Sequence, residues 1–375
     1  MLTTNAIQGF TKKQASPFFF SEEEPRENFE TCEKNVFFLT CVGCSISQDL
    51  KLMGVGDFLG NVNLYETGSS LRIPSMQTNI GDGVRYLEFH VEVTSCLLAG
   101  TIGGQVFALN IEDGSVDVQF LAQFWGPVTS IRSVADKGKA FIIVGTGGGS
   151  LSLYQHNLGL RKLKVQDLTL KWSFVAHEPS TDAFNLHFGS LGKFSEVWST
   201  ISNSNQLDCI LTASEDQTVR LWQLSDEISN PKLKQVLSGH TAAVTSVDWK
   251  QLKQVGEVLA TCSDDKTVRI YQREAKEFKL QFVLDTYFLT DWHTLTYMAL
   301  EDQGTRIAAV TENSYLVIWD LVDSLKHKRQ TVLFAKKIHI GSIESLQWKQ
   351  NTLVCAASDC AFTFISLADN EYSKL

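Results

Sequence analysis

Two stretches of the chain repeat a histidine, a serine and an aspartate, the residue types that a serine hydrolase uses for nucleophilic catalysis. In such a triad the histidine takes the proton of the serine hydroxyl and the aspartate orients the histidine. An enzyme needs the trio once, in a cleft, whereas here it falls twice on the same repeated frame. We therefore interpret both sets as structural and expect no catalytic residues. The sets are His177, Ser214 and Asp216, and His240, Ser263 and Asp265.

Three further patterns resemble ligand sites, and each has a simpler interpretation. The glycine clusters at 100–104 and 145–150 lack the Gly-Lys-Ser/Thr of a phosphate loop, and a strand-like run follows each of them. We expect tight turns there. The Cys-x-x-Cys pair at 41–44 lacks a clear second pair of ligands, which a structural zinc site needs. We predict neither a metal nor a cofactor.

The elements that must position these residues are short strands in a repeating unit. The segments LTASEDQTVRLWQL (211–224) and LATCSDDKTVRIYQR (259–273) share a strand, a Ser-x-Asp turn and an alternating strand that ends at Trp222 or Tyr271. Alternation with period two is typical of a strand with one buried face. Weaker copies give seven strand ends, at positions 65, 109, 154, 222, 271, 319 and 366. A spacing in the mid-40s is typical of a β-propeller with four strands per blade.

The sequence thus predicts an all-β fold, a single seven-bladed propeller over 1–375 with four-stranded antiparallel blades. The last unit has too few residues for its fourth strand, so we expect an N-terminal arm (about 1–30, with Pro17–Ser21 as the natural donor) to close the ring. We call the four strands of each unit a to d, in the order in which they occur in the repeat. The one long spacing predicts an insertion within 178–208, and we expect it to form a longer loop between strands a and b of blade four. The approximate units are 31–79, 80–122, 123–172, 173–237, 238–289, 290–336 and 337–375.

The segment from 238 to 272 resembles a WD40 repeat. In that family a histidine before strand a, a serine or threonine ending strand b, an aspartate in the b–c turn and a tryptophan on strand c form a hydrogen-bonded set. The resemblance implies such sets at His240, Ser263, Asp265 and Tyr271, and at His177, Ser214, Asp216 and Trp222. The turn aspartate is replaced by Asn313 in blade six and by Cys360 in blade seven. In blades two and three, Gly103 and Gly148 occupy the turn, and we expect apolar packing to replace the polar set.

Composition and charge exclude several classes of protein. The 375 residues are 43% hydrophobic and carry a formal charge of −9, whereas proteins that coat nucleic acid are usually basic. The sequence has no apolar run of about 18 residues, so we predict no membrane span. The first residues lack the basic-then-apolar order of a signal peptide. We expect a cytoplasmic or nuclear protein with reduced cysteines.

The leading functional hypothesis is a non-enzymatic scaffold, a monomeric propeller that binds proteins or peptides within a larger complex. The resemblance implies that the residue before the first apolar position of strand a lines the binding surface. Two nearby tryptophans would be stronger anchors if exposed, because aromatic residues dominate binding hot spots. The candidate partner surface consists of Trp125, Pro127, Ala243, Trp292, Thr294 and Ser342.

Two other functions remain open from the sequence. Basic clusters recur at the c–d turn or outer strand of blades three to six, and those at Lys326, Lys328 and Arg329 could receive a phosphopeptide or acidic motif. The simpler interpretation is that lysines protect outer sheet edges. A propeller hydrolase would need carboxylates or histidines in the central channel. The inner strands show only isolated charges at positions such as Arg132 and Asp248.

Overall fold

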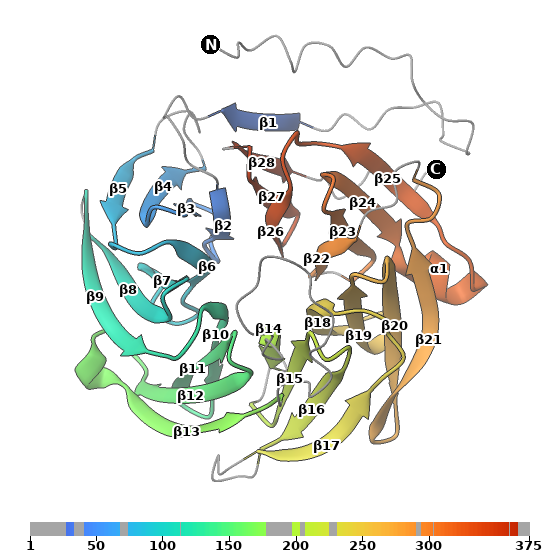
Figure 1. Ribbon diagram of the computed structural model, residues 1–375, viewed down its shortest axis with the longest axis horizontal. Coiled ribbons are helices and arrows are strands. Elements are labelled where there is room, and N and C mark those ends of the chain that lie inside the picture. Colours follow the sequence, from blue (N-terminus) through green and yellow to red (C-terminus); the bar gives the residue numbers. More distant parts are fainter. Residues whose placement is uncertain are drawn as a thin grey trace, which may run out of the picture.

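The computed structural model describes residues 28–33, 41–67, 74–112, 114–177, 197–202, 207–224, 231–289, 294–302, 304–359 and 361–366. They form seven four-stranded antiparallel sheets, the blades, arranged in a ring around a common centre (Figure 1). The prediction of an all-β, seven-bladed propeller is confirmed. In each blade we name the strands a to d from the centre outwards.

Blades one to four follow one another along the chain, each as a simple antiparallel run of strands. Blade one contains β2 (Cys41–Ile46), β3 (Leu52–Asp57), β4 (Asn61–Glu66) and β5 (Met76–Asn79). Blade two contains β6 (Val84–Phe89), β7 (Cys96–Thr101), β8 (Gln105–Glu112) and β9 (Ser115–Gln123). Blade three contains β10 (Val128–Asp136), β11 (Lys139–Thr146), β12 (Ser150–Asn157), the short helix η2 (Val165–Asp167) and β13 (Thr169–Val175). Blade four contains β14 (Val197–Ser202), β15 (Cys209–Ser214), β16 (Val219–Gln223) and β17 (Lys232–Leu237).

Blades five to seven complete the ring, and blade six carries the α-helix of the described chain on its c–d connection. Blade five contains β18 (Val244–Leu252), β19 (Gly256–Ser263), β20 (Thr267–Glu274) and β21 (Glu277–Asp285). Blade six contains β22 (Leu295–Leu300), β23 (Arg306–Thr311), β24 (Tyr315–Asp320), α1 (Leu321–His327) and β25 (Val332–Lys337). Blade seven contains β26 (Ile343–Lys349), β27 (Thr352–Ala357), β28 (Ala361–Ser366) and β1 (Asn28–Glu33). Neither this helix nor any other in the described ranges is long and apolar enough to cross a membrane.

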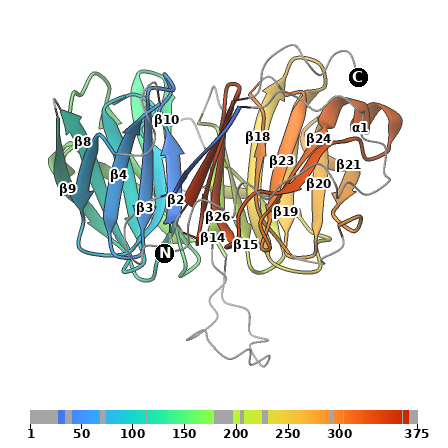
Figure 2. The ribbon, with the colours of Figure 1, turned by 90° about the horizontal axis from the view of Figure 1, so that it is seen from above.

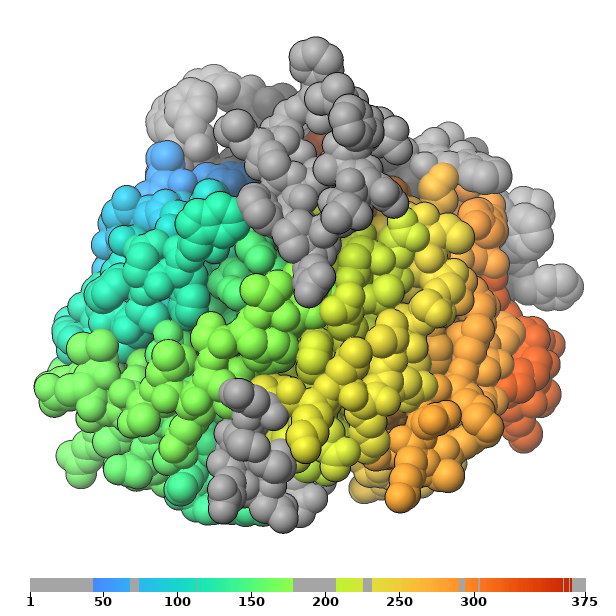
Figure 3. All heavy atoms as spheres, turned by 60° about the horizontal axis from the view of Figure 1, so that its bottom comes forward, coloured from blue at the N-terminus to red at the C-terminus, as the bar shows by residue number. Residues whose placement is uncertain are grey.

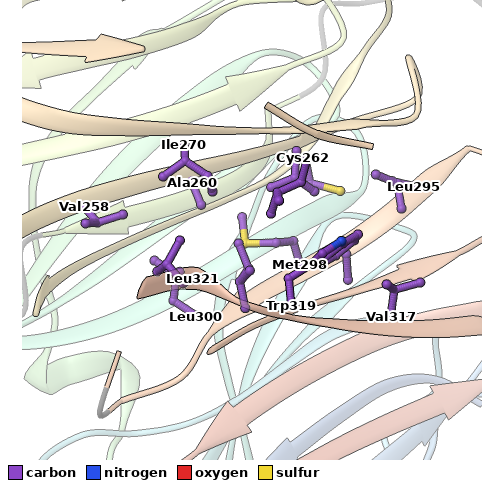
Figure 4. Close-up of a cluster of buried hydrophobic side chains, with 14 of the residues drawn as sticks. Val258, Ala260, Cys262, Ile270, Leu295, Met298, Leu300, Val317, Trp319 and Leu321 are labelled. Atoms are coloured by element: carbon purple, nitrogen blue, oxygen red, sulfur yellow. The ribbon is translucent and has the colours of Figure 1, made fainter. Parts of the chain in front are cut away.

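The hydrophobic core lies between the blades rather than inside any one of them. Seven clusters of buried side chains each join a pair of neighbouring blades, including the pair formed by blades seven and one. Figure 4 shows the cluster between blades five and six, where Cys262 and Ile270 face Met298 and Trp319. Because each blade buries one apolar face against each neighbour, a single blade has no core of its own.

The two ends of the described chain meet in blade seven. Strand β1 pairs antiparallel with β28, from Asn28 opposite Ser366 to Glu33 opposite Ala361. Closure by an N-terminal strand was expected, but the strand is formed by residues 28–33, downstream of the suggested donor. Pro17–Ser21 lies outside the described residues. The pairing covers the outer edge of β28, which would otherwise expose unpaired backbone groups.

The extra residues of blade four lie before its strand a. Strand β13 ends at Val175 and β14 begins at Val197, whereas only residues 203–208 separate β14 from β15. The predicted longer a–b loop is therefore wrong. Val175 pairs with Ser150 and Val197 pairs with Ser214, so both ends of the insertion lie beside b–c turns. Residues 178–196 themselves lie outside the described part of the chain.

The glycine clusters form tight b–c turns. Gly104 and Gly149 have φ values of +84° and +74°, in the left-handed region, and a strand follows each of them. Lys266 occupies the same turn position in blade five, also with positive φ. The turn geometry is thus common to these blades, and glycine adopts it without steric cost.

Candidate functional site

The b–c turns and the d–a loops share one face of the ring, which we call the b–c face. The side view shows the strands running between this face and the opposite one (Figure 2). Both kinds of connection meet there because strand a pairs with strand b, so the start of a lies beside the end of b. In blade five, Val244 at the start of strand a is opposite Ser263 at the end of strand b. We build the candidate site on this face.

A chain of hydrogen bonds joins the d–a loop of blade five to its b–c turn. Nδ1 of His240 lies 2.8 Å from Oδ2 of Asp265, and its Nε2 lies 2.7 Å from Oγ1 of Thr261. Asp265 also accepts from the backbone N and Oγ1 of Thr267. Burial opposes ionisation of Asp265, but the bonds with His240 and Thr267 outweigh it and hold the pKa of the carboxyl well below its usual range. This network closes the turn with ionised Asp265 as an acceptor.

Blade four repeats the network and identifies a residue that the sequence interpretation missed. His177 contacts Asp216 at 2.8 Å and Thr212 at 2.7 Å, and Nε1 of Trp222 donates to Oγ1 of Thr212 at 3.0 Å. The hydroxyl between histidine and tryptophan thus comes from Thr212, two residues before the predicted Ser214. Residues two apart in a strand point to the same face, so the sequence pattern alone could not decide which of the two contacts the histidine.

The two predicted serines have a different role from the one expected. Oγ of Ser263 accepts from the backbone N of Asp265 at 3.1 Å, and Oγ of Ser214 accepts from that of Asp216 at 3.3 Å. Each serine therefore caps its own turn and does not contact the histidine. The hydroxyl of Tyr271 bonds to Thr261, as Trp222 bonds to its threonine in blade four.

Blade seven has a polar set as well, one residue away from where the sequence frame placed it. His339 contacts Oδ2 of Asp359 at 3.2 Å, so the turn aspartate is Asp359 and the assignment to position 360 is wrong. The frame was shifted because it ended strand c at Ser366, whereas Ile365 is the residue that pairs with strand b as Tyr271 does in blade five. Nε2 of His339 bonds at 2.9 Å to Thr363 on strand c, opposite Cys355 on strand b. In blade five the threonine that contacts the histidine stands on strand b, whereas in blade seven it stands on strand c.

Blade two closes its turn with a third arrangement. Asp82 stands in the d–a loop, and its Oδ2 accepts at 2.8 Å from the backbone N of Gly103 in the b–c turn. A Cβ atom on Gly103 would lie 2.3 Å from that oxygen, so the contact requires glycine. Apolar packing was expected to replace the polar set here. The structure instead retains a polar link, with the acidic group on the opposite segment.

The predicted ring of surface residues contributes mainly through its backbone. Four backbone carbonyls each accept a hydrogen bond from the backbone N of the residue directly after strand b: those of Pro127, Ala243, Thr294 and Ser342. For Pro127 that residue is Gly147. Their side chains are half-buried. These positions therefore hold the turns in place, and their use as a partner surface stays a proposal. Trp292 lies outside the described residues.

Large exposed hydrophobic side chains gather on the b–c face. Ile340, Trp125 and Leu59 are 80%, 68% and 62% exposed. The ring of Trp125 lies over Gly148 in the turn of blade three, where a Cβ would come within 2.9 Å of Cε3. The backbone N of Ile340 donates to Asp359, which fixes its loop. We call the exposed group the apolar set: Phe58, Leu59, Ile102, Trp125, Tyr287, Phe288 and Ile340.

The same face carries an acidic sector over blades four to six. Glu215, Asp264 and Glu312 each follow the last residue of a strand b directly. Burial, and then the negative charges of Glu312 and Glu215, raise the pKa of Asp264 to about 6. The three carboxylates are therefore close enough to repel one another, and positive charge from a partner would relieve that repulsion.

The predicted basic arc lies on the rim, and several of its cations are already paired. Lys326 and Lys328 are exposed at the end of α1, and Lys328 donates to the backbone O of Gln281 at 3.1 Å. Arg329 lies 3.5 Å from Asp323. Lys162 of blade three contacts a carboxylate at 2.7 Å. Figure 3 shows the green, yellow and orange blades side by side along this rim. Local pairing leaves less free positive charge than the sequence suggested.

The two inner-strand charges that looked isolated, Arg132 and Asp248, have partners. Arg132 lies 3.3 Å from Glu88, a residue that the sequence interpretation passed over. Asp248 accepts from the backbone N of Trp249 and of Leu300. These groups do not form the cluster of free carboxylates and histidines that a channel hydrolase would need.

Comparison with known proteins accounts for this geometry. The family described as WD domain, G-beta repeat matches residues 188–223 and 231–272, which contain strands β14 to β16, strands β17 to β19 and most of β20. The chain contains WD40 repeats. Its WD40 signature is strongest in blades four and five.

Relatives of this WD40-repeat protein share part of its length. It is 30% identical over 149 residues to a WD repeat-containing protein WDS homolog from Arabidopsis thaliana, 39% of this chain and 22% of that protein. It is 26% identical over 223 residues to the U3 small nucleolar RNA-associated protein 21 homolog of Schizosaccharomyces pombe, 59% of this chain and 21% of that protein. Denticleless protein homolog A of Xenopus laevis is 33% identical over 101 residues, 27% of this chain and 13% of that protein. The matched regions thus span less than a quarter of each of these relatives.

Proposed function

We propose that this WD40-repeat protein is a non-enzymatic scaffold that docks a protein partner on its b–c face. The observation that carries the proposal is the apolar set, which is held exposed on rigid turns. Fixed loops reduce the ordering cost of binding, and exposed aromatic and aliphatic side chains supply the anchors.

The chemistry of the face also favours one kind of partner. The acidic sector lies over blades four to six, whereas Leu59, Ile102 and Trp125 lie over blades one to three. A segment with apolar side chains at one end and lysine or arginine at the other matches both parts. Complementary charge contributes mostly to orientation and association rate, and apolar burial to affinity.

The experiment compares partner capture by three purified forms of the chain. The test variant is Leu59→Ser with Trp125→Ala and Ile340→Ser, all on the b–c face. The matched control is Leu170→Ser with Leu233→Ser, which are exposed on outer strands β13 and β17. We expect proteins recovered by affinity purification and mass spectrometry to be lost with the test variant and retained with the control. Equal recovery with both variants would refute docking on this face.

The basic rim gives the alternative function, a reader of phosphopeptides or acidic motifs. Lys326→Glu with Lys328→Glu and Arg329→Glu reverses its charge and leaves the b–c face unchanged. If this variant loses partners that the b–c variant retains, the rim is the binding surface. We also propose a cytoplasmic or nuclear location. The name of the Schizosaccharomyces pombe relative, which refers to a small nucleolar RNA, favours the nucleus.

A further inference from the structure

The centre of the ring holds a cavity of about 540 Å³ that belongs to none of the surfaces described so far. The inner strands β6, β10, β18, β22 and β26 line it and surround the centre in Figure 1. A volume of this size is typical of a small-molecule site. Polar and charged side chains provide much of the lining. The ionisable groups are Glu88, Arg132, Asp248, Lys250, Asp302 and Lys349, with two tyrosines beside them.

Two of the carboxylates in the cavity are fully used by the protein. Oδ1 of Asp248 accepts from the backbone N of Trp249 at 2.9 Å and its Oδ2 from that of Leu300 at 2.8 Å. Asp302 accepts from Nζ of Lys250 at 2.6 Å and from the backbone N of Gln350 at 2.7 Å. These acids and Lys250 form one local group in which each charge has a partner.

The remaining cations share a single carboxylate. Nη1 of Arg132 lies 3.3 Å from Oε1 of Glu88, and the other oxygen of Glu88 accepts from Nε2 of Gln347 at 3.2 Å. Nε of Arg132 is buried and has no hydrogen-bond partner among the described residues. Buried donors are normally satisfied, so an unpartnered donor on a side chain that lines a cavity indicates a missing acceptor.

Lys349 is the second cation without an acceptor. Its side chain lines the cavity, and it has neither a hydrogen bond nor an ion pair within the ranges that the structure describes. Burial lowers the pKa of its ammonium group; the charge of Glu88 opposes that shift and the charge of Arg132 adds to it. Arg132 and Lys349 thus carry one positive charge more than Glu88 neutralises. The group of Asp248, Asp302 and Lys250 carries the compensating negative charge, but its hydrogen bonds go to other donors and leave Nε of Arg132 and Nζ of Lys349 without an acceptor among the described residues.

We propose that the cavity binds the oxyanion head group of a small polar molecule, held between the guanidinium of Arg132 and the ammonium of Lys349. A carboxylate can accept from both cations at once, and arginine presents paired donors to such a group. Ser246, Ser345 and Tyr297 also line the cavity and suit a ligand that carries hydroxyl groups. This site is independent of partner docking on the b–c face.

The test uses three probes of similar size, gluconate, glucose 6-phosphate and glucose, with binding followed by calorimetry and by melting temperature. We expect gluconate to bind the wild-type chain and to raise its melting temperature, and uncharged glucose to do neither. Binding of glucose 6-phosphate in place of gluconate would replace the carboxylate by a phosphate as the head group, and the oxyanion site would stand. If neither anion binds, the proposal is wrong.

The variants locate the binding. Lys349→Met keeps the length of the side chain and removes its charge, and we expect it to weaken gluconate about tenfold or more. Without ligand it should melt no lower than wild type, because an unpaired buried charge opposes folding. Lys349→Arg should retain binding. Lys171→Met, at an exposed lysine on β13, is the matched control and should bind as wild type does. Equal affinity in Lys349→Met and wild type would place the anion elsewhere and overturn the assignment.

Discussion

Replacement of Asp265 by alanine tests whether the polar network stabilises blade five. The carboxylate accepts four hydrogen bonds, from Nδ1 of His240, the backbone N of Thr241, and the backbone N and Oγ1 of Thr267. Thr241 is exposed, so water can replace the carboxylate at its backbone N. The bonds from His240 and Thr267 are less accessible. At the lower end of about 1.5–3 kcal/mol for a bond to a charged acceptor, these three bonds predict a loss of about 4.5 kcal/mol.

The assay is unfolding by urea at pH 7, followed by tryptophan fluorescence, for a series of substitutions at two adjacent positions. Asp265→Asn keeps an acceptor for Thr267 and can donate to the other tautomer of His240, so we expect it to cost about 1 kcal/mol. Asp264→Asn is the comparison variant: it changes the neighbouring carboxylate and leaves the network intact, so we expect no loss of stability from it. The same unfolding free energy for Asp265→Ala and wild type would refute the reasoning.

The pH dependence gives an independent check of the same residue. Burial opposes ionisation of Asp265, but its hydrogen bonds outweigh burial and hold the pKa below its ordinary value of 3.8, so the folded state binds this proton less readily than the unfolded state. The contribution is therefore fully present above about pH 4 and is lost as the pH falls further. The difference between wild type and Asp265→Ala should be constant from pH 7 to 5 and shrink in stronger acid. A difference that grows on acidification would contradict this assignment.

The other predictions concern the turns and a buried histidine pair. Asp359→Ala should lower the free energy of unfolding by about 2 kcal/mol, whereas Cys360→Ala should leave it unchanged, as measured by urea unfolding. Asp264→Asn should stabilise the chain at pH 7 by about 1 kcal/mol, because burial and nearby acids raise the pKa of Asp264 to about 6. The gain should vanish below about pH 4, where the wild-type group is neutral in both states. His90, in the a–b loop of blade two, is buried with its Nε2 2.9 Å from Nε2 of His156 on β12 of blade three. Burial and then the charge of His156 lower the pKa of His90 from 6.5 to about 3, so stability should fall as the pH drops through that range. His90→Asn should reduce the slope.

The fold could be predicted because periodicity is a property of the whole chain. Six spacings between seven strand ends carried the prediction, and it survived an incorrect frame in blade seven. Ending strand c at Ser366 instead of Ile365 shifted the local alignment by one residue without changing the spacing much. Single residues inside the frame were less predictable. Thr261 and Ser263 both point to the same side of strand β19, and only three-dimensional contacts show that Thr261 meets His240.

The candidate site was less accessible to sequence reasoning than the fold. Exposure of Trp125 depends on its stacking over Gly148 in a neighbouring turn, which the order of residues along the chain does not reveal. Arg132 looked isolated because its partner Glu88 stands 44 residues earlier, on the next blade. Contacts between blades join residues that are far apart in sequence, so a reading within single repeats cannot find them. Glu88 and Arg132 each stand four residues after the first residue of strand a in their own blades. That shared position is the signal that would have linked them.

The departures from the repeat point to where the chain acts. Blades four, five and seven close their turns with an aspartate and a histidine. The polar atoms of these two residues are bonded to each other at the b–c face. Blades two and three have glycine in theirs, with Asp82 bonded to Gly103 in blade two, and Ile102 and Trp125 are exposed there. The apolar set is exposed beside both kinds of turn, since Ile340 stands next to the Asp359 turn of blade seven. Such exposure costs solubility and has no benefit for folding. It is the physical argument for the proposal that a partner covers these side chains.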